Sequence, residues 1–268
     1  MEKKFKLGVI GAGFMSRAIV EGAISSGFLN CSSILVSDVS ATALDYLSKK
    51  GVEVTTDNAK IFSEAEFILF AVKPQVFESV AKKTSSDYSY KIISIMAGVK
   101  KDRIKSFYPE AEIARCMPNT PCSVGYGAVG MDVSSFKEKS DADFIINLFS
   151  SFAKVVVLDE IMLNTVTGIS GSAPAYFYLF LKGIIDAAVK RGLNENDARI
   201  LACNTMIGSG LMVLKNSDKC LEELIDAVCS KGGTTIEAVK VFNEHNIGDI
   251  TDAAVNACIN RAAELENL

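Results

Sequence analysis

The sequence of 268 residues predicts an α/β protein, in which an N-terminal doubly wound parallel sheet is followed by an all-helical C-terminal domain. From residue 6 to about 160, short apolar strands alternate with helical patterns, which is typical of a parallel sheet covered by helices. After residue 162 every segment has helical length and period. Because the chain is longer than one typical domain and 49% apolar, we expect two domains, at 1–162 and 163–268.

Apolar runs predict the strands of the sheet. The run at 67–72 is apolar throughout, as expected of a strand that is buried on both faces. Two later segments predict edge strands with a helix between them. The expected strands are Leu7–Ile10, Ile34–Val36, Val52–Val54, Phe67–Val72, Lys91–Ile95 and Glu112–Cys116, with edge strands Gly125–Met131 and Lys154–Val157 around a helix at Asp141–Ser151.

Five helices are expected in the C-terminal domain. Pairs of alanines recur within them, and such small residues permit close helix packing. So much apolar helix surface would be buried more completely in a homodimer, with a compact monomeric bundle as the alternative. The expected helices are Ala175–Arg191, Glu195–Lys215, Cys220–Cys229, Thr235–Glu244 and Ile250–Leu265.

A glycine turn follows the first strand. The run 7–10 breaks into Gly11-Ala12-Gly13 and then into a helical pattern at 18–24, although the third position of the usual motif is Ser16 rather than glycine. Gly11 would make the tight turn, and Gly13 would let a pyrophosphate approach the unpaired amides at the helix start. The alternative is a structural turn in a sheet that binds no nucleotide.

An acidic residue ends the second strand. Asp38 stands where a carboxylate can accept hydrogen bonds from the ribose of adenosine. It would repel the 2′-phosphate of NADPH, but Ser37, Ser40 and Thr42 could still receive that phosphate. The order strand, Gly-x-Gly, helix, strand, acid predicts a Rossmann domain that binds a dinucleotide, and it leaves NADPH and NADH both open.

Unusual loops follow the fourth, fifth and sixth strands, where an open parallel sheet binds its ligands. Pro74 stops the fourth strand, and Lys73 can meet a nicotinamide ribose or a phosphate, unless it is a solvated loop lysine. Gly98 can bring backbone close to a flat ring. In Met117-Pro118-Asn119-Thr120-Pro121, two prolines hold a rigid turn.

Two glycine-rich loops open helices in the C-terminal part, at 167–176 and 230–235. Converging amides and hydroxyls at such a helix start can hold a small carboxylate, by the same physics as phosphate binding. Ordinary helix capping is the alternative for either loop.

Composition excludes several classes of protein. The net charge is −4 and the Lys and Arg residues are scattered, which argues against a nucleic-acid partner. The sequence shows neither a signal-peptide pattern nor an apolar run long enough to span a membrane, so we expect a cytoplasmic protein without a membrane partner.

Metal and disulfide chemistry are not indicated. The seven cysteines are odd in number and never form Cys-x-x-Cys, which favours buried free thiols. His245 is the single histidine, so a multi-histidine metal site is impossible, and a Ser-His-Asp triad would have to use this residue. We expect no metal.

Five motif blocks are spread along the whole chain. They are Gly11-Ala12-Gly13-Phe14-Met15, Ala71-Val72-Lys73-Pro74-Gln75, Arg115-Cys116-Met117-Pro118-Asn119-Thr120-Pro121, Gly168-Ile169-Ser170-Gly171-Ser172 and Ser230-Lys231-Gly232-Gly233-Thr234-Thr235. Together these blocks resemble the pyrroline-5-carboxylate reductase family, which catalyses the last step of proline biosynthesis. The chain departs from the family pattern at Lys231, where proline is usual, at Ala173, where glycine is usual, and at Ala227, where the family often has a polar residue.

The resemblance implies an NAD(P)H-dependent oxidoreductase that reduces the C=N bond of 1-pyrroline-5-carboxylate to give L-proline. It also implies a helical domain that intertwines in a homodimer, often the unit of a larger ring, with the substrate held between the domains. Thr235 would be the catalytic residue, its hydroxyl bonding the ring nitrogen. The cofactor, NADPH or NADH, would be lined by Ile10, Gly11, Ala12, Gly13, Phe14, Met15, Ser37, Asp38, Asn58, Ala71, Val72, Lys73, Pro74 and Ala97, and the substrate by Glu160, Ser230, Gly233, Thr234 and Thr235.

Three other functions remain open at the level of sequence. A β-hydroxyacid dehydrogenase shares this layout but uses a lysine early in the first helix of its second domain, whereas Lys182 here lies about two turns into that helix. A non-catalytic nucleotide-binding paralogue is supported by Lys231 alone. A reductase of a related cyclic imine, such as a six-membered homologue, is the third.

Overall fold

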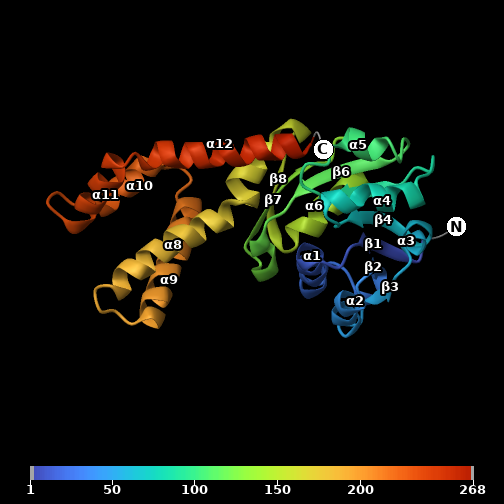
Figure 1. Ribbon diagram of the computed structural model, residues 1–268, viewed down its shortest axis with the longest axis horizontal. Coiled ribbons are helices and arrows are strands. Elements are labelled where there is room, and N and C mark those ends of the chain that lie inside the picture. Colours follow the sequence, from blue (N-terminus) through green and yellow to red (C-terminus); the bar gives the residue numbers. More distant parts are fainter. Residues whose placement is uncertain (1–2, 267–268) are drawn as a thin grey trace. The chain divides into compact units, whose positions relative to one another are not determined.

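A computed structural model describes residues 3–266 and contains an eight-stranded sheet in the order β3-β2-β1-β4-β5-β6-β7-β8 (Figure 1). The sheet reverses its order between β1 and β4, and the pairs from β3 to β6 are all parallel, as a doubly wound fold requires. The strands are β1 (Phe5–Ile10), β2 (Ile34–Ser37), β3 (Glu53–Thr55), β4 (Ala65–Phe70), β5 (Lys91–Ser94), β6 (Glu112–Met117), β7 (Gly127–Asp132) and β8 (Ala153–Val157).

Helices cover both faces of this sheet, and each face has its own hydrophobic core. Because side chains alternate along a strand, Leu7 and Val9 of β1 belong to one core, whereas Phe5 and Ile10 belong to the other. One face is covered by α1 (Phe14–Ser25), α2 (Ala41–Ser48) and α6 (Lys139–Ser150), and the other by α3 (Asn58–Glu64), α4 (Pro74–Thr84) and α5 (Lys101–Lys105).

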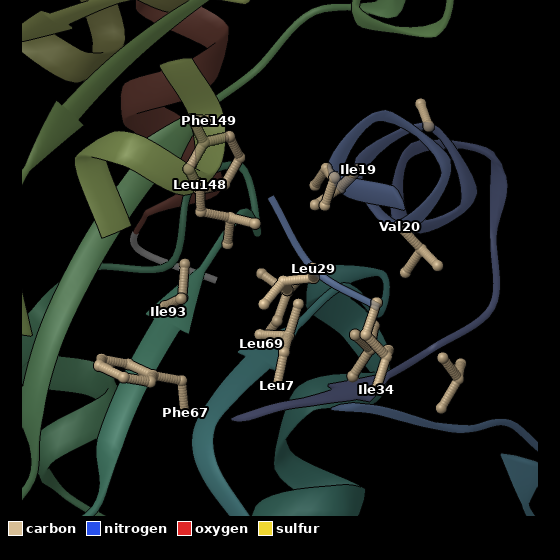
Figure 2. Packing of buried hydrophobic residues seen from close by; sticks show 14 of the residues in the cluster. Leu7, Ile19, Val20, Leu29, Ile34, Phe67, Leu69, Ile93, Leu148 and Phe149 are labelled. Carbon is tan, nitrogen blue, oxygen red and sulfur yellow. The ribbon is translucent and has the colours of Figure 1, made fainter. Parts of the chain in front are cut away.

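The first of these cores lies under α1 and α6. Figure 2 shows Leu7, Leu69 and Ile93 from three neighbouring strands beside Ile19 of α1 and Phe149 of α6. All five side chains are fully buried, and each such burial stabilises the fold by about 1.5–3 kcal/mol. This core fixes the start of α1 against the carboxyl end of β1.

One strand pair departs from the parallel arrangement that the sequence predicts. β7 runs antiparallel to β6, with Cys116 opposite Met131, and β8 then pairs parallel with β7. The physical reason is the connection at 118–126, which holds only the short 3-10 turn η2 (Thr120–Val124). A parallel return needs a crossover of about a dozen residues or more, usually a helix.

The chain divides into two compact units, Met1–Pro174 with Ala257–Leu268, and Ala175–Asn256. The two division points, after residues 174 and 256, fall inside long helices. The domain boundary predicted between residues 162 and 163 stays a prediction. The later elements are η3 (Glu160–Met162), α7 (Leu163–Val166), the π-helical η4 (Thr167–Gly171), α8 (Ala173–Val189), α9 (Glu195–Lys215), α10 (Leu221–Val228), α11 (Thr234–Glu244) and α12 (Ile247–Leu265); a further 3-10 turn, η1, spans Cys31–Ser33.

The helices of the second unit carry many exposed apolar side chains. Leu179 of α8 and Leu214 of α9 are each 73% exposed, and similar residues occur on α10 and α11. A monomeric protein rarely leaves such an extended apolar surface in water. This surface is therefore expected to be covered by another chain.

Between residues 3 and 266, none of the helices combines the length and the apolar character needed to cross a bilayer. The same stretch contains no group of three or more His, Cys, Asp or Glu side chains arranged to hold a metal ion.

Candidate active site

The glycine turn has the geometry of a phosphate-binding loop. Gly11 has φ +104°, a conformation that favours glycine, and a Cβ placed there would lie 2.7 Å from the carbonyl oxygen of Ala71. A Cβ at Gly13 would meet no atom within 4 Å, so the backbone there faces open space. Gly13 is the N-cap of α1 and no side chain caps the helix. The first amides of α1 are therefore available to a pyrophosphate.

Ser16, the serine at the third motif position, is buried against this turn. It is 1% exposed, and its hydroxyl donates to the carbonyl oxygen of Gly13 at 2.9 Å. Phe14, beside it at the start of α1, is 61% exposed, and Met15 is partly buried. The serine thus replaces the packing glycine without blocking the helix start.

Asp38 is held against the glycine turn by two backbone amides. Its Oδ2 accepts from the Ala12 amide at 2.6 Å, and its Oδ1 accepts from the Ser40 amide at 2.8 Å. Each carboxylate oxygen keeps a second lone pair, so the group can still accept hydrogen bonds from a ribose. The carboxylate therefore has a fixed position at the end of β2.

Ser37 points the opposite way, because neighbouring side chains alternate along β2. Its side chain is fully buried, and its hydroxyl donates to Asn58 Oδ1 at 2.7 Å. Its carbonyl oxygen accepts from the Gly11 amide at 2.8 Å. Ser37 is thus placed to position the turn and Asn58, and its buried hydroxyl is not exposed to receive a phosphate.

The loops after β4 and β5 reach the same edge of the sheet. The Ala71 amide donates to the carbonyl oxygen of Ile10 at 2.9 Å, which joins the end of β4 to the glycine turn. Val72 is partly buried, Lys73 is exposed as the N-cap of α4, and Pro74 is the first residue of that helix.

Ala97 and Gly98 follow β5 at this edge. Ala97 packs against a small cluster formed by Met117, Leu163 and Val166. Gly98 has φ +73°, and a Cβ there would lie 2.9 Å from Cβ of Leu265 in α12. The backbone at Gly98 therefore approaches α12 closely within the first unit, and its approach to a flat ring stays a prediction.

A group of charged side chains lies behind these loops, and we call Lys101, Arg115, Asp132, Glu160 and Glu266 the Arg115 cluster. Arg115 of β6 is 2% exposed and bonds Glu160 at 3.2 Å and Glu266 at 3.0 Å. Lys101 pairs with Asp132 at 2.7 Å. Glu160 also accepts from the Lys101 amide, so its carboxylate is fixed by two elements.

Two carboxyl groups of this cluster, those of Asp132 and Glu266, have a pKa below the ordinary value. Burial opposes ionisation of Asp132, but hydrogen bonds from Lys101 and Ser134 outweigh it, so the pKa of Asp132 lies below its ordinary value. Burial likewise opposes ionisation of Glu266, and hydrogen bonds from Lys100, Asn164 and Arg115 lower the pKa below the usual value for glutamate.

Asn119 joins two of the motif blocks found in the sequence. Its Oδ1 accepts from the Ala128 amide at 2.9 Å, and its Nδ2 lies 3.3 Å from the hydroxyl oxygen of Ser170 in the π-helical turn η4. A π-helical turn inside a helical segment is frequent at functional sites. The turn after β6 and the start of the segment leading into α8 are thus fixed to each other.

The glycine-rich loop at 230–235 lies in the second unit and opens α11. Gly233 is the N-cap, and its amide donates to the carbonyl oxygen of Ser230 at 2.9 Å. A Cβ at Gly233 would lie 2.4 Å from Ser230 Oγ, so only glycine brings that hydroxyl beside the helix start. Ser230, Thr234 and Thr235 are exposed, and no side chain caps α11. The loop can therefore offer three hydroxyls and free amides to a small carboxylic acid.

His245 is the C-cap of α11. The helix is 11 residues long, which places this histidine about 16 Å from Thr234 along the axis. The histidine therefore cannot act as an acid or base at the loop of its own helix.

The predicted residues divide between the two units. The fourteen that were expected to line a cofactor lie in the first unit, at or beside the carboxyl ends of β1, β2, β4 and β5 or, for Asn58, at the start of α3. Glu160 also lies in the first unit, whereas Ser230, Gly233, Thr234 and Thr235 lie in the second.

Three residues at this site were not singled out as site residues by the sequence. The sequence could have indicated Arg115, since a charged residue inside a buried strand needs a partner. The position of Asn119 between two prolines is a weaker sequence signal. No sequence signal identifies Glu266, because its contact to Arg115 spans 151 residues.

Known proteins match both parts of the chain. Residues 160–265 match the family model described as pyrroline-5-carboxylate reductase dimerisation, and residues 6–98 match the one described as NADP oxidoreductase coenzyme F420-dependent. The pyrroline-5-carboxylate reductase of Vibrio alginolyticus is 36% identical over 272 residues, covering 100% of both chains. That of Arabidopsis thaliana is 33% identical, covering 98% of this chain and 96% of the relative.

Solved structures agree with these relatives. A pyrroline-5-carboxylate reductase from Coxiella burnetii has a TM-score of 0.88 at 31% identity, with 98% of this chain and 99% of that chain covered. The pyrroline carboxylate reductase of Plasmodium falciparum, solved with NADP bound, has a TM-score of 0.88 at 27% identity, with 99% and 100% covered.

The matched dimerisation domain and the exposed apolar helices of the second unit together identify a chain that assembles as a homo-oligomer. The uncapped start of α1, the open space at Gly13 and the anchored Asp38 fit NAD(P)H. With relatives above 30% identity over its full length, the chain belongs to the pyrroline-5-carboxylate reductase family of NAD(P)-dependent oxidoreductases.

Proposed function

We propose that this protein reduces the C=N bond of 1-pyrroline-5-carboxylate with NAD(P)H and releases L-proline. The observation that carries the proposal is a pair of uncapped helix starts, each preceded by glycine, at α1 and at α11. One suits the pyrophosphate of a dinucleotide, and the other suits the carboxylate of a small acid. Full-length relatives that carry the name of this activity support the same reaction.

The residues of the first unit would bind the cofactor. The amides of Phe14 and Met15 at the start of α1 would hold the pyrophosphate, and Asp38 would hold the adenosine ribose. Ile10, Ala71 and Ala97 lie where the nicotinamide half would pass. Ser37 would act indirectly, through the turn and Asn58.

Val72, Lys73 and Pro74 would complete the cofactor site beside Ala71. Pro74 fixes the start of α4 and so restricts the backbone at the exposed Lys73, which precedes it. An ammonium group there would contact the nicotinamide ribose or a phosphate. The bound cofactor supplies a hydride, so the chain's own task is to orient it and exclude water.

The loop of the second unit would bind the substrate. Ser230, Gly233 and Thr234 would bind its carboxylate, and the Thr235 hydroxyl oxygen would accept a hydrogen bond from the protonated ring nitrogen. Glu160 would lie near the substrate, its carboxylate fixed by Arg115. A protonated imine is already electrophilic, so the hydride adds to C5 and the proton taken from solvent remains on nitrogen. Positioning then carries most of the rate.

We also propose that the homo-oligomer is built from two-fold dimers of the helical domain, at 163–268, that can join in a larger ring. The exposed apolar side chains of α8 and α9 support a self-complementary interface. A cytoplasmic location is part of the proposal, because seven unpaired cysteines suit a reducing compartment.

Substitution of Thr235 tests the reaction and the site together. We expect Thr235→Ala to lower kcat/KM for 1-pyrroline-5-carboxylate by about ten- to a hundredfold, because a hydrogen bond to a charged group is lost. Thr235→Ser should restore most of the rate, and the Kd for the nucleotide should not change. The matched control is Thr251→Ala in α12, where the hydroxyl donates to Ile247 within the same helix.

The outcomes separate the alternatives. An unchanged rate in Thr235→Ala removes Thr235 from the site. Faster reduction of the six-membered homologue than of the five-membered imine points to a related cyclic imine as substrate. Nucleotide binding without turnover of either imine identifies a non-catalytic paralogue and contradicts the proposed function.

A further inference from the structure

We infer that Asp38 makes this protein selective for NADH over NADPH. The inference deepens the proposed function and rests on it for the identity of the site. It follows from how the carboxylate is anchored, from which hydrogen-bond donors around it are already used, and from where the nearest cations lie. The consequence concerns nucleotide affinity, so it can be tested without the imine.

The Asp38 carboxylate cannot move aside to admit a phosphate. Its two oxygens accept from the amides of Ala12, at 2.6 Å, and of Ser40, at 2.8 Å. Rotation of the side chain would leave both backbone amides without this partner, and an unsatisfied amide is costly. The amide of Asp38 itself donates to the carbonyl oxygen of Thr55 at 3.3 Å, which ties the backbone to β3.

Three hydrogen-bond donors near Asp38 are already used within the protein. The Ser40 amide bonds Asp38, and the Ala43 amide near the start of α2 bonds the Ser40 hydroxyl at 3.3 Å. The hydroxyl of Ser37 is buried and bonds Asn58. Of the three hydroxyls that the sequence left open for a phosphate, that of Ser37 is therefore used as a donor inside the protein, whereas that of Ser40 accepts from the Ala43 amide.

The segment that follows Asp38 supplies no positive charge for a phosphate. Residues 37–48 contain no lysine or arginine, and Val39, directly after Asp38, is 96% exposed. An arginine near this place is the usual partner of a 2′-phosphate. The valine offers apolar surface, which suits an adenine face and not a phosphate.

Two lysines that follow α2 and one arginine of α1 make contacts of their own. Lys49 pairs with Asp45 at 2.6 Å and Lys50 with Glu21 at 3.2 Å. Arg17 of α1 donates its Nε hydrogen to the carbonyl oxygen of Ala12 at 3.0 Å, and its guanidinium lies 4.7 Å from the centre of the Tyr46 ring. A 2′-phosphate at Asp38 would thus meet a fixed negative charge. Of these three cations in the described part of the chain, Arg17 alone has no carboxylate partner, so the test below includes it.

The size of the effect follows from the repulsion of like charges. Two unit charges about 4 Å apart near a protein surface change an equilibrium constant by between about fivefold and several hundredfold. We therefore expect the Kd for NADH to be at least about fivefold lower than that for NADPH at low ionic strength. Added salt should narrow the difference, because the site is open to solvent.

The test is calorimetric titration of the full-length protein with NADH and with NADPH, in the absence of imine. Asp38→Asn should reduce the ratio of the two Kd values to within about threefold, by strengthening NADPH and weakening NADH. The matched control is Asp45→Asn on the adjacent helix α2, which removes the same charge without a bond to the glycine turn. Its ratio should equal that of the wild type.

Three results would overturn the inference. The first is equal or tighter binding of NADPH by the wild type. The second is a ratio that Asp38→Asn leaves unchanged while circular dichroism shows a folded protein. The third is NADPH binding that Arg17→Gln abolishes, because Arg17 would then be the phosphate partner. Failure of imine turnover alone would refute the proposed reaction but leave these affinities interpretable.

Discussion

Replacing Arg115 by methionine removes the cation shared by two carboxylates inside the first unit. Arg115 is 2% exposed, and its guanidinium lies 3.2 Å from Glu160 and 3.0 Å from Glu266. Breaking a buried ion pair from one side costs about 3–5 kcal/mol, because the remaining charge is left without its partner. In the variant, Glu266 still has its ion pair with Lys100 at 3.0 Å, and the side chain of Glu160 is 27% exposed and can be solvated. We therefore expect the free energy of unfolding to fall by about 2–4 kcal/mol.

Urea denaturation at a fixed chain concentration measures this loss, since self-association links stability to concentration. Far-ultraviolet circular dichroism is the suitable signal because the chain has no tryptophan. Arg261→Met is the control: its pair with Glu264 lies near the same end of α12, and both side chains are 62% exposed. That change should cost about 0.5 kcal/mol or less.

A double-mutant cycle then isolates the pair. Glu266→Gln removes the carboxylate charge, and the combination of Arg115→Met with Glu266→Gln should cost about 1–3 kcal/mol less than the sum of the single changes. If Arg115→Met lowers the free energy of unfolding by an amount within about 0.5 kcal/mol of that for Arg261→Met, the ion pairs of Arg115 do not have the stabilising role assigned to them. The Arg115 cluster would then behave like a surface pair.

The remaining predictions concern the glycine turn, the motif loops and the response to acid. Gly13→Ala should leave the thermal midpoint unchanged and weaken nucleotide binding by at least about tenfold, because its Cβ enters open space at the cofactor edge. The control Gly27→Ala, at a glycine with φ +74° and open space around it, should lower the midpoint and leave nucleotide affinity unchanged. The reverse pattern would exclude a role for Gly13 in nucleotide binding. Asn119→Ala should cost about 1–3 kcal/mol in urea, because the Ala128 amide loses its acceptor, and an unchanged midpoint would contradict that bond. The pKa of Asp132 is lowered from 3.8, so its stabilisation is fully present above that pH and is lost as the pH falls through the folded-state value; urea midpoints measured across this range should fall with acid, and by less in Asp132→Asn.

Local chemistry allowed most of the sheet and the glycine turn to be predicted. Gly11 needs a positive φ and Gly13 needs open space, and both requirements follow from the strand, turn and helix pattern alone. The order of strands also follows, because alternating strands and helices permit few arrangements. The antiparallel β7 was accessible in principle, since a connection at 118–126 is too short for a crossover helix.

Contacts between distant parts of the chain were not accessible. Nothing in the sequence pairs Arg115 with Glu266 or brings Leu265 to Gly98, because these contacts depend on where α12 ends in the folded protein. The orientation of the Ser37 side chain depends on which face of β2 is buried. The sequence predicted cofactor contacts for both Ser37 and Asp38, because it does not show that the Ser37 side chain is buried. The anchoring of Asp38 by the Ala12 amide likewise required coordinates.

Product formation by the full-length protein with 1-pyrroline-5-carboxylate and NADH is the decisive measurement for the proposed reaction. L-proline is quantified by chromatography alongside the loss of reduced nicotinamide. We expect one proline for each hydride donor oxidised, with a rate that falls in Thr235→Ala and recovers in Thr235→Ser. Oxidation of the nicotinamide without proline, or no oxidation while NADH binds, would contradict the proposed reaction.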